Sequence, residues 1–237
     1  MNGALHLRTR GSGTRTRGAT LIFAASVVAV LAATSARVSA ADDEHSKVMG
    51  SVHVEPGEHT GDATTVNGSV EIGANAVVRK ADTVNGSVTL GEHSTAESMN
   101  TVNGSARLEK GARVSGNVAL VNGHISLDEG ADVSGRVTNV NGGIQLDAAH
   151  VGGGIETTTG DINIGSNSRV EGGILVNEDN SWFNFGSPKT PRVVIGPGAI
   201  VKGTLRFKRE VKLYVSDRAT IGTVEGATAN KFSGEHP

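Results

Sequence analysis

The stretch that decides the fold is TVNGSVTL at residues 83–90, because TVNGSARL repeats it at residues 101–108. The Val-Asn-Gly triplet within it begins at Val66, Val84, Val102, Val121 and Val140, at spacings of 18, 18, 19 and 19 residues. Degenerate copies at residues 48–50, 158–160 and 176–177 continue the series in both directions. Self-similarity at a fixed period is typical of repeat architectures, in which each unit contacts only its neighbours.

A six-residue period lies within the longer one. Starting from Val84, an aliphatic residue returns at Leu90, Ala96, Val102 and Leu108. Because eighteen is three sixes, each repeat divides into three short strands that alternate inward and outward side chains. The pattern predicts an all-β fold, a three-sided β-solenoid (β-helix) with about 18 residues per coil, and it predicts that these aliphatic side chains face inward.

The composition agrees with a slim interior. The chain of 237 residues has 33 Gly and only seven aromatic residues, and residues 24–181 contain no Phe, Tyr or Trp. A narrow three-sided coil accommodates Val, Ile, Leu and Ala, whereas larger rings would overpack it. Gly after Asn supplies the positive φ that a sharp corner can require.

Asparagines recur at one corner of the coil. Stacked coils place them above one another, so their amides can form a ladder of hydrogen bonds along the axis. We expect this structural role, rather than a row of ligand-binding groups, for Asn67, Asn85, Asn103, Asn122, Asn141 and Asn177.

The first forty residues predict export. Residues 1–18 carry four Arg and no acid, an apolar run follows over residues 19–36, and Val38-Ser39-Ala40 is a small-x-small cleavage site. We expect a signal peptide over residues 1–40 and a periplasmic or cell-surface location; an uncleaved membrane anchor is the alternative. Residues 1–40 hold five of the 22 basic and none of the 24 acidic residues, so the remainder carries a net charge of −7.

The remaining segments follow from where the period holds and where it breaks. We expect a linker over residues 41–47, a regular solenoid over 48–177, an aromatic loop over 178–191, C-terminal solenoid coils over 192–226 and a flexible tail over 227–237. Charge divides along the same line, with a net charge of −12 over residues 41–188 and +5 over residues 189–237.

Four segments share one pattern: GARVSGNV at 111–118, GADVSGRV at 130–137, SRVEGGI at 168–174 and GAIVKGTL at 198–205. The pattern resembles the repeat of the bactofilins, or polymer-forming cytoskeletal proteins. That resemblance implies a three-sided β-helix that polymerises end to end without a nucleotide. Bactofilins are cytoplasmic, and in its signal peptide and Val-Asn-Gly corner this chain looks more like the exported β-strand-repeat proteins classed as adhesins.

No catalytic site, metal site or cofactor is expected. The hexad is also similar to that of hexapeptide acyltransferases, which use a His base and inserted loops, but residues 48–177 run with single-residue insertions only. Histidines such as His53 and His59 fall on successive faces of one coil and do not converge. The acidic residues, for example Glu71, Asp82 and Asp132, are expected on outward positions without a defined catalytic pair.

The function expected from the sequence is that of an exported, non-enzymatic solenoid with a structural, self-assembling role in the bacterial cell envelope, its copies meeting head to tail. The alternative is an adhesin that binds glycan or a membrane surface; a carbohydrate-active or acyl-transferring enzyme is the third hypothesis. Nucleic acid is not an expected partner. Candidate contact residues are Trp182, Phe183, Phe185, Lys202, Arg206, Lys208, Arg209 and Lys212. The alternative for the three aromatic residues is a structural loop that covers the side of the solenoid or caps a coil, and the alternative for the five basic residues is a solvated face. For the adhesin hypothesis, Trp182→Ala should weaken binding.

Overall fold

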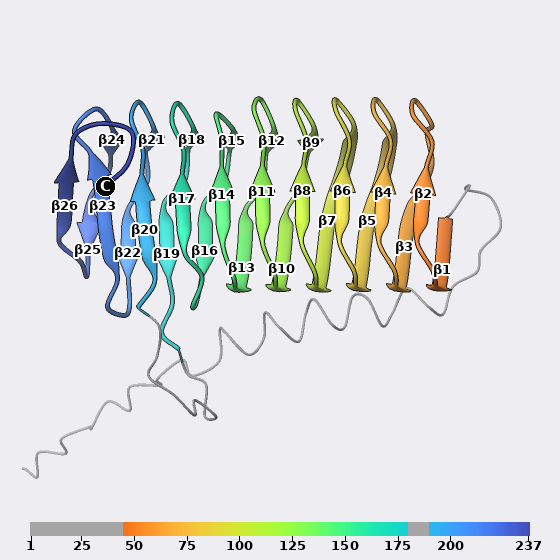
Figure 1. The fold of residues 1–237 in the computed structure, drawn as a ribbon, viewed down its shortest axis with the longest axis horizontal. Coiled ribbons are helices and arrows are strands. Elements are labelled where there is room, and N and C mark those ends of the chain that lie inside the picture. The colour runs from red at the N-terminus through yellow and green to blue at the C-terminus, as the bar shows by residue number, and fades with distance from the viewer. Residues whose placement is uncertain (1–44, 180–189) are drawn as a thin grey trace, which may run out of the picture.

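The computed structural model describes residues 45–179 and 190–237 and shows a β-solenoid without helices in these ranges. Parallel strands stack along one long axis, from β1 at one end to β26 at the other (Figure 1). The ten-stranded sheet takes one strand from each coil, so the solenoid has ten coils. The predicted fold class is confirmed.

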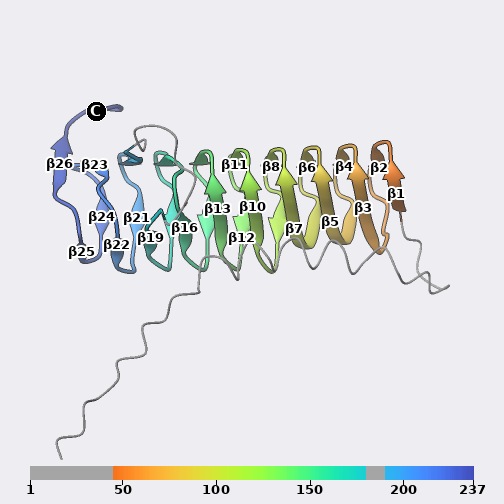
Figure 2. The ribbon, with the colours of Figure 1, turned by 90° about the horizontal axis from the view of Figure 1, so that it is seen from below.

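Each coil has three sides, which we call the first, second and third faces. The first face contains β1 (His45–Met49), β3 (Asp62–Asn67), the second half of β5 (Val77–Asn85) and of β7 (Thr95–Asn103), β10 (Val118–Asn122), β13 (Val137–Asn141), β16 (Ile155–Thr157), β19 (Ile174–Val176), β22 (Leu205–Phe207) and β25 (Val224–Glu225). Figure 2 shows the earlier of these strands side by side in one layer.

The second face is the ten-stranded sheet. It contains β2 (Val52–Val54), β4 (Val70–Ile72), β6 (Val88–Leu90), β8 (Ala106–Leu108), β11 (Ile125–Leu127), β14 (Ile144–Leu146), β17 (Ile162–Ile164), β20 (Arg192–Ile195), β23 (Lys212–Ser216) and β26 (Ala229–Phe232). The third face contains the first halves of β5 and β7, then β9 (Arg113–Val114), β12 (Asp132–Val133), β15 (His150–Val151), β18 (Arg169–Val170), β21 (Ile200–Val201) and β24 (Thr220–Ile221).

The interior is aliphatic along its whole length. The second face contributes two inward columns, one of them running through Ile72, Leu90, Leu108 and Leu127, and all four of these side chains are buried. Phe207 is the one aromatic side chain among the buried core residues of the described ranges. The predicted exclusion of rings from the earlier coils is therefore explained by a narrow core that only aliphatic side chains fill.

The inward prediction was wrong for the valines of the Val-Asn-Gly triplet. On the first face the inward column runs through Thr65, Thr83 and Thr101, whose hydroxyls donate to the carbonyls of Gly50, Gly68 and Gly86 in the preceding coil at 2.9, 2.9 and 3.0 Å. Neighbouring residues in a strand point to opposite sides. The valine that follows each of these threonines therefore points outward, is partly exposed and lies outside the core.

The corner glycines are required by close approach. A Cβ at Gly86 would lie 1.9 Å from the carbonyl oxygen of Gly68, and one at Gly104 would lie 1.8 Å from that of Gly86. Their φ angles of 156° and 157° are positive, as expected for this corner, so a side chain at either position would be strained as well as too close to the preceding coil. Left-handed residues occur also at the corner between the second and third faces, for example Gly111, Gly130 and Ala148 with φ of 68°, 74° and 45°.

Both ends differ from the expected boundaries. Strand β1 starts at His45, within the expected linker, and Ala229–Phe232, expected in a flexible tail, pairs with β23. Glu235 in the following residues receives a hydrogen bond from Arg218 at 3.1 Å.

Candidate functional site

The asparagines of the triplet form a hydrogen-bonded column. The column begins at Asn67, and the Nδ2 groups of Asn85, Asn103, Asn122 and Asn141 each donate to Oδ1 of the asparagine one coil earlier, at 2.9 to 3.0 Å. Thr159 continues the column by bonding Oδ1 of Asn141. Because each amide is occupied by its neighbours, the column serves the stacking of coils.

Asn177 does not belong to this column, contrary to the prediction. The coil between Thr157 and Val176 contains 19 residues rather than 18, so Asn177 aligns with Thr158 and misses Thr159 by one position. Its amide donates to Glu156 at 2.7 Å, and its oxygen accepts from Lys208 at 3.0 Å.

The basic residues near the C-terminus are dispersed and mostly paired. Lys202 lies 2.9 Å from Glu171, Arg206 lies 2.7 Å from Glu225, and Lys208 bonds Asn177. Arg209 lies 3.7 Å from Asp179, while Lys212 starts β23 on the second face. These five cations therefore do not converge on one patch. Trp182, Phe183 and Phe185 lie outside the described residues.

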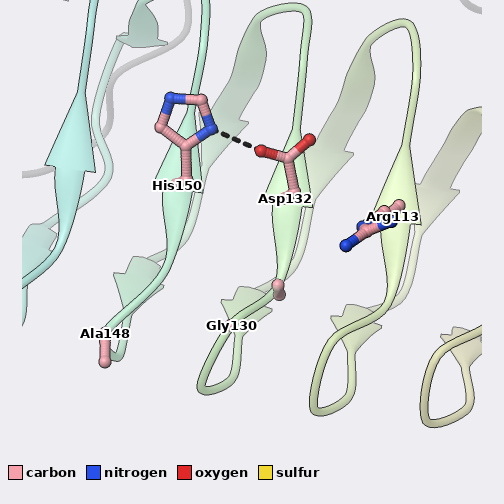
Figure 3. A pocket seen from close by; sticks show the side chains of 6 residues that line it. Arg113, Gly130, Asp132, Ala148 and His150 are labelled. Carbon is pink, nitrogen blue, oxygen red and sulfur yellow. Dashed lines mark hydrogen bonds and ion pairs between the residues drawn. The ribbon is translucent and has the colours of Figure 1, made fainter.

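A charged row crosses the third face. Arg113, Asp132 and His150 occupy the same outward position in successive coils, and Nδ1 of His150 contacts Oδ1 of Asp132 (Figure 3). They line an open hollow of about 450 Å³ at the adjoining corner. The row can hydrogen-bond a polar ligand.

The charged row continues into later coils. Glu171 lies 2.9 Å from Lys202 and contacts Arg169, and these two cations lower the pKa of its carboxyl to about 2. Within residues 45–179 and 190–237, no three His, Asp or Glu side chains are grouped closely enough to hold a metal ion.

Two acidic residues, Asp62 and Asp82, are buried, against the expectation that the acids face solvent. Asp82 is 1% exposed and accepts a hydrogen bond from Asn100 at 2.8 Å. Loss of solvent raises the pKa of its carboxyl to about 6, although the Asn100 bond acts in the opposite direction. The strand alternation that puts Asp82 on the outer side of the first face was readable in the sequence, but its burial was not.

Polar side chains occupy inward positions at the N-terminal end of the solenoid. His45 and Lys47 precede Ala63 and Thr65 in the two inward columns of the first face. Nε2 of His45 lies 2.9 Å from Glu58, and Lys47 donates to the Ser51 carbonyl at 2.7 Å. The amide of Glu55, which donates to Glu58 at 2.8 Å, and His45 lower the pKa of the Glu58 carboxyl. Charged residues at inward positions of an edge strand oppose the pairing of that edge with a strand of another chain.

The outward valines of the triplet form a second feature that sequence periodicity missed. We call Val48, Val66, Val84, Val102, Val121 and Val140 the valine stripe; they share one outward position on the first face in six successive coils. Five are partly exposed, and Val48 at the start is 68% exposed. A threonine precedes several of these valines in the sequence. Since neighbouring residues of a strand point to opposite sides, an inward threonine would have predicted an outward valine.

Comparisons with known proteins add no family to this geometry. No protein-family model, no curated protein and no solved structure matches the chain. In the part of the chain that the structure describes, no helix is both long enough and apolar enough to cross a membrane.

Proposed function

We propose that the chain is an exported, non-enzymatic β-solenoid with a structural, self-assembling role in the bacterial cell envelope. The observation that carries this proposal is the pair of open sheet edges at the ends of the rod. Strands β2 and β26 end the ten-stranded sheet, and within the described residues neither has a partner strand on its outer edge. Unpaired edges are templates for pairing with another chain.

A head-to-tail contact fits the chain's polarity. All strands within a face are parallel, so β2 of one copy can continue the second face after β26 of another without reversing direction. In this head-to-tail orientation, the basic C-terminal quarter of one copy faces the acidic body of the next copy, and their opposite net charges attract. The polar inward residues His45, Lys47 and Glu58 limit the stability of this contact, so assembly along the axis should be weak and sensitive to salt.

A proline on β2 tests the contact directly. Val52 donates to Ser69 and the Val54 carbonyl accepts from Gly73, so the groups of His53 between them point to the open edge. His53→Pro removes one donor from that edge without removing a bond inside the rod. We expect electron microscopy and sedimentation of the purified protein to show axial oligomers at 25 mM salt that fall with added salt, disappear in His53→Pro and persist in the control His53→Ala. Monomers at high concentration and low salt would contradict the proposal.

A further inference from the structure

The valine stripe is unlike the outer surface of the other two faces. On the second face the corresponding outward column carries polar or charged residues such as His53, Glu71 and Arg107. On the third face it carries Arg113, Asp132 and His150. The first face instead presents valine in six coils in succession, Val48 exposed and the other five partly exposed. Apolar surface gathered in one place marks a site of interaction.

The columns beside the stripe are almost uncharged. The outward residues two positions earlier in the same six strands are Ser46, Thr64, Asp82, Asn100, Ala119 and Thr138. Asp82 is the one charged member; it is 1% exposed and bonded to Asn100. On the other side lies the asparagine column, whose amides are satisfied by one another. The surface is therefore apolar at its centre with a neutral polar rim, the arrangement of a protein interface.

We propose that this surface pairs with the same surface of a second copy, so that two solenoids associate side by side through their first faces. Identical valines at the strand spacing of about 4.8 Å form ridges and furrows that complement themselves, as in sheets packed about 10 Å apart. A contact of the same patch on both copies closes with two-fold symmetry and leaves the rod ends free. The inference rests on the proposed self-assembling function and adds a lateral contact to it.

The distribution of charge points to the first face as the place where two copies can meet, and the area of that face indicates a weak contact. The chain after residue 40 carries a net charge of −7, so two copies repel each other overall, and the valine stripe is where they can meet without opposing exposed charges. Six strands at about 4.8 Å and a width of five residues at about 3.3 Å give roughly 480 Å² per copy. A standard stable interface buries about 800 Å² per partner, so the pair should be weak and concentration-dependent.

Salt distinguishes the lateral contact from the axial one. Screening reduces the repulsion between two acidic rods and leaves apolar burial intact, so lateral pairing should hold or tighten between 50 and 500 mM NaCl. Axial contact between acidic and basic ends should weaken over the same range. The sign of the salt effect therefore separates failure of this inference from failure of the proposed function.

The test uses the protein purified from its own cells after any processing of the N-terminus, and mass spectrometry identifies the first residue. Sedimentation velocity from 5 to 200 μM should show a monomer–dimer equilibrium at 500 mM NaCl. Val102→Lys should weaken dimerisation more than a hundredfold, and the isosteric set Val84→Thr, Val102→Thr and Val121→Thr at least tenfold. Thr89→Lys, which adds the same charge on the outer side of the second face, is the control and should dimerise like the unchanged protein. Circular dichroism and melting of each variant verify the fold.

Cross-linking gives a second, independent measurement. The chain has no cysteine, so Val102→Cys introduces a single thiol near the middle of the stripe. A short bis-maleimide should join two copies through it, and should not join copies of the control Thr89→Cys. Dimers that survive Val102→Lys but disappear in His53→Pro would overturn the lateral contact and leave the axial one. A protein that is monomeric in every condition would overturn both, and protection of the Val102→Cys thiol in that monomer would point to coverage by the chain's own N-terminal segment.

Discussion

The asparagine column has a direction, and this direction can be tested with two matched substitutions. Nδ2 of Asn103 donates to Asn85 at 3.0 Å, while its Oδ1 accepts from Asn122 at 3.0 Å. Asn67 starts the column: it aligns with Met49 in the first coil, and its Oδ1 accepts from Asn85 at 2.9 Å. Asn103→Asp and Asn67→Asp each add one negative charge and remove one amide NH₂ group.

The two substitutions should differ in sign. A carboxylate at position 103 cannot donate, so the bond to Asn85 is lost and two oxygen atoms face each other; we expect a loss of about 1–2 kcal/mol in unfolding free energy. A carboxylate at position 67 keeps the bond from Asn85 and strengthens it by its charge, which gives between zero and about 1 kcal/mol of stabilisation. The difference between the variants is therefore about 2 kcal/mol.

Urea unfolding followed by far-ultraviolet circular dichroism measures this difference. With a slope of roughly 2 kcal/mol per molar urea, the two midpoints should lie about 1 M apart. Slopes must be compared too, because a solenoid can unfold in stages. Equal destabilisation by both substitutions would refute the directed column, since it would mean that the added charge on an acidic body, rather than the lost donor, determines the effect.

Four further substitutions test the corners, the interior and the buried Asp82 carboxyl. Gly104→Ala should destabilise the fold by more than about 3 kcal/mol, because its Cβ would lie 1.8 Å from the Gly86 oxygen. In Gly130→Ala the nearest atom to the new Cβ is 3.8 Å away, so this substitution should cost only the penalty for a left-handed backbone, about 1–2 kcal/mol. Thermal melting of the two variants compares these losses. Thr101→Val should lose about 1 kcal/mol by removing a buried donor to the same Gly86 carbonyl, measured by urea unfolding. Burial raises the pKa of the Asp82 carboxyl from 3.8 to about 6. The contribution of Asp82 to the free energy of unfolding is therefore greatest below pH 3.8 and is lost as the pH rises through about 6. Asp82→Asn should add up to about 3 kcal/mol at pH 8 and flatten the dependence between pH 4 and 7; an unchanged pH profile would contradict the burial argument.

Much of the fold was predictable because a repeat reports its own geometry. The 18-residue period and the six-residue step within it determined the number of faces, the aliphatic core and the corner that carries Asn85 and its equivalents. The step could not determine which side of the sheet each aliphatic residue occupies on the first face. There the inward column contains Thr65, Thr83 and Thr101, polar residues whose hydroxyls are satisfied by backbone carbonyls, and hydrophobicity alone assigns such residues to the surface.

The candidate site was less predictable because its features depend on register between coils. One extra residue between Thr157 and Val176 moves Asn177 out of the asparagine column, and only the strand pairing shows this. The basic residues expected to form a contact surface, for example Lys202 and Arg206, each meet a carboxylate from a neighbouring coil. The composition indicates that the C-terminal quarter is basic. It does not show which of these basic side chains lie beside a carboxylate, because that depends on which residues the stacked coils bring together.

The orientation of the valines changes where assembly should be sought. If the valines of the triplet pointed inward, the outer surface of the first face would be polar and hydrated, and copies would associate mainly through the open ends of the rod. Because Val84 and Val102 point outward, the rod has an apolar side as well as open ends. The N-terminal end places His45, Lys47 and Glu58 at inward positions, where a second coil stacked on it would have to cover their charges. A side contact covers methyl groups and no exposed charge, so the side of the rod should tolerate high salt while its ends should not.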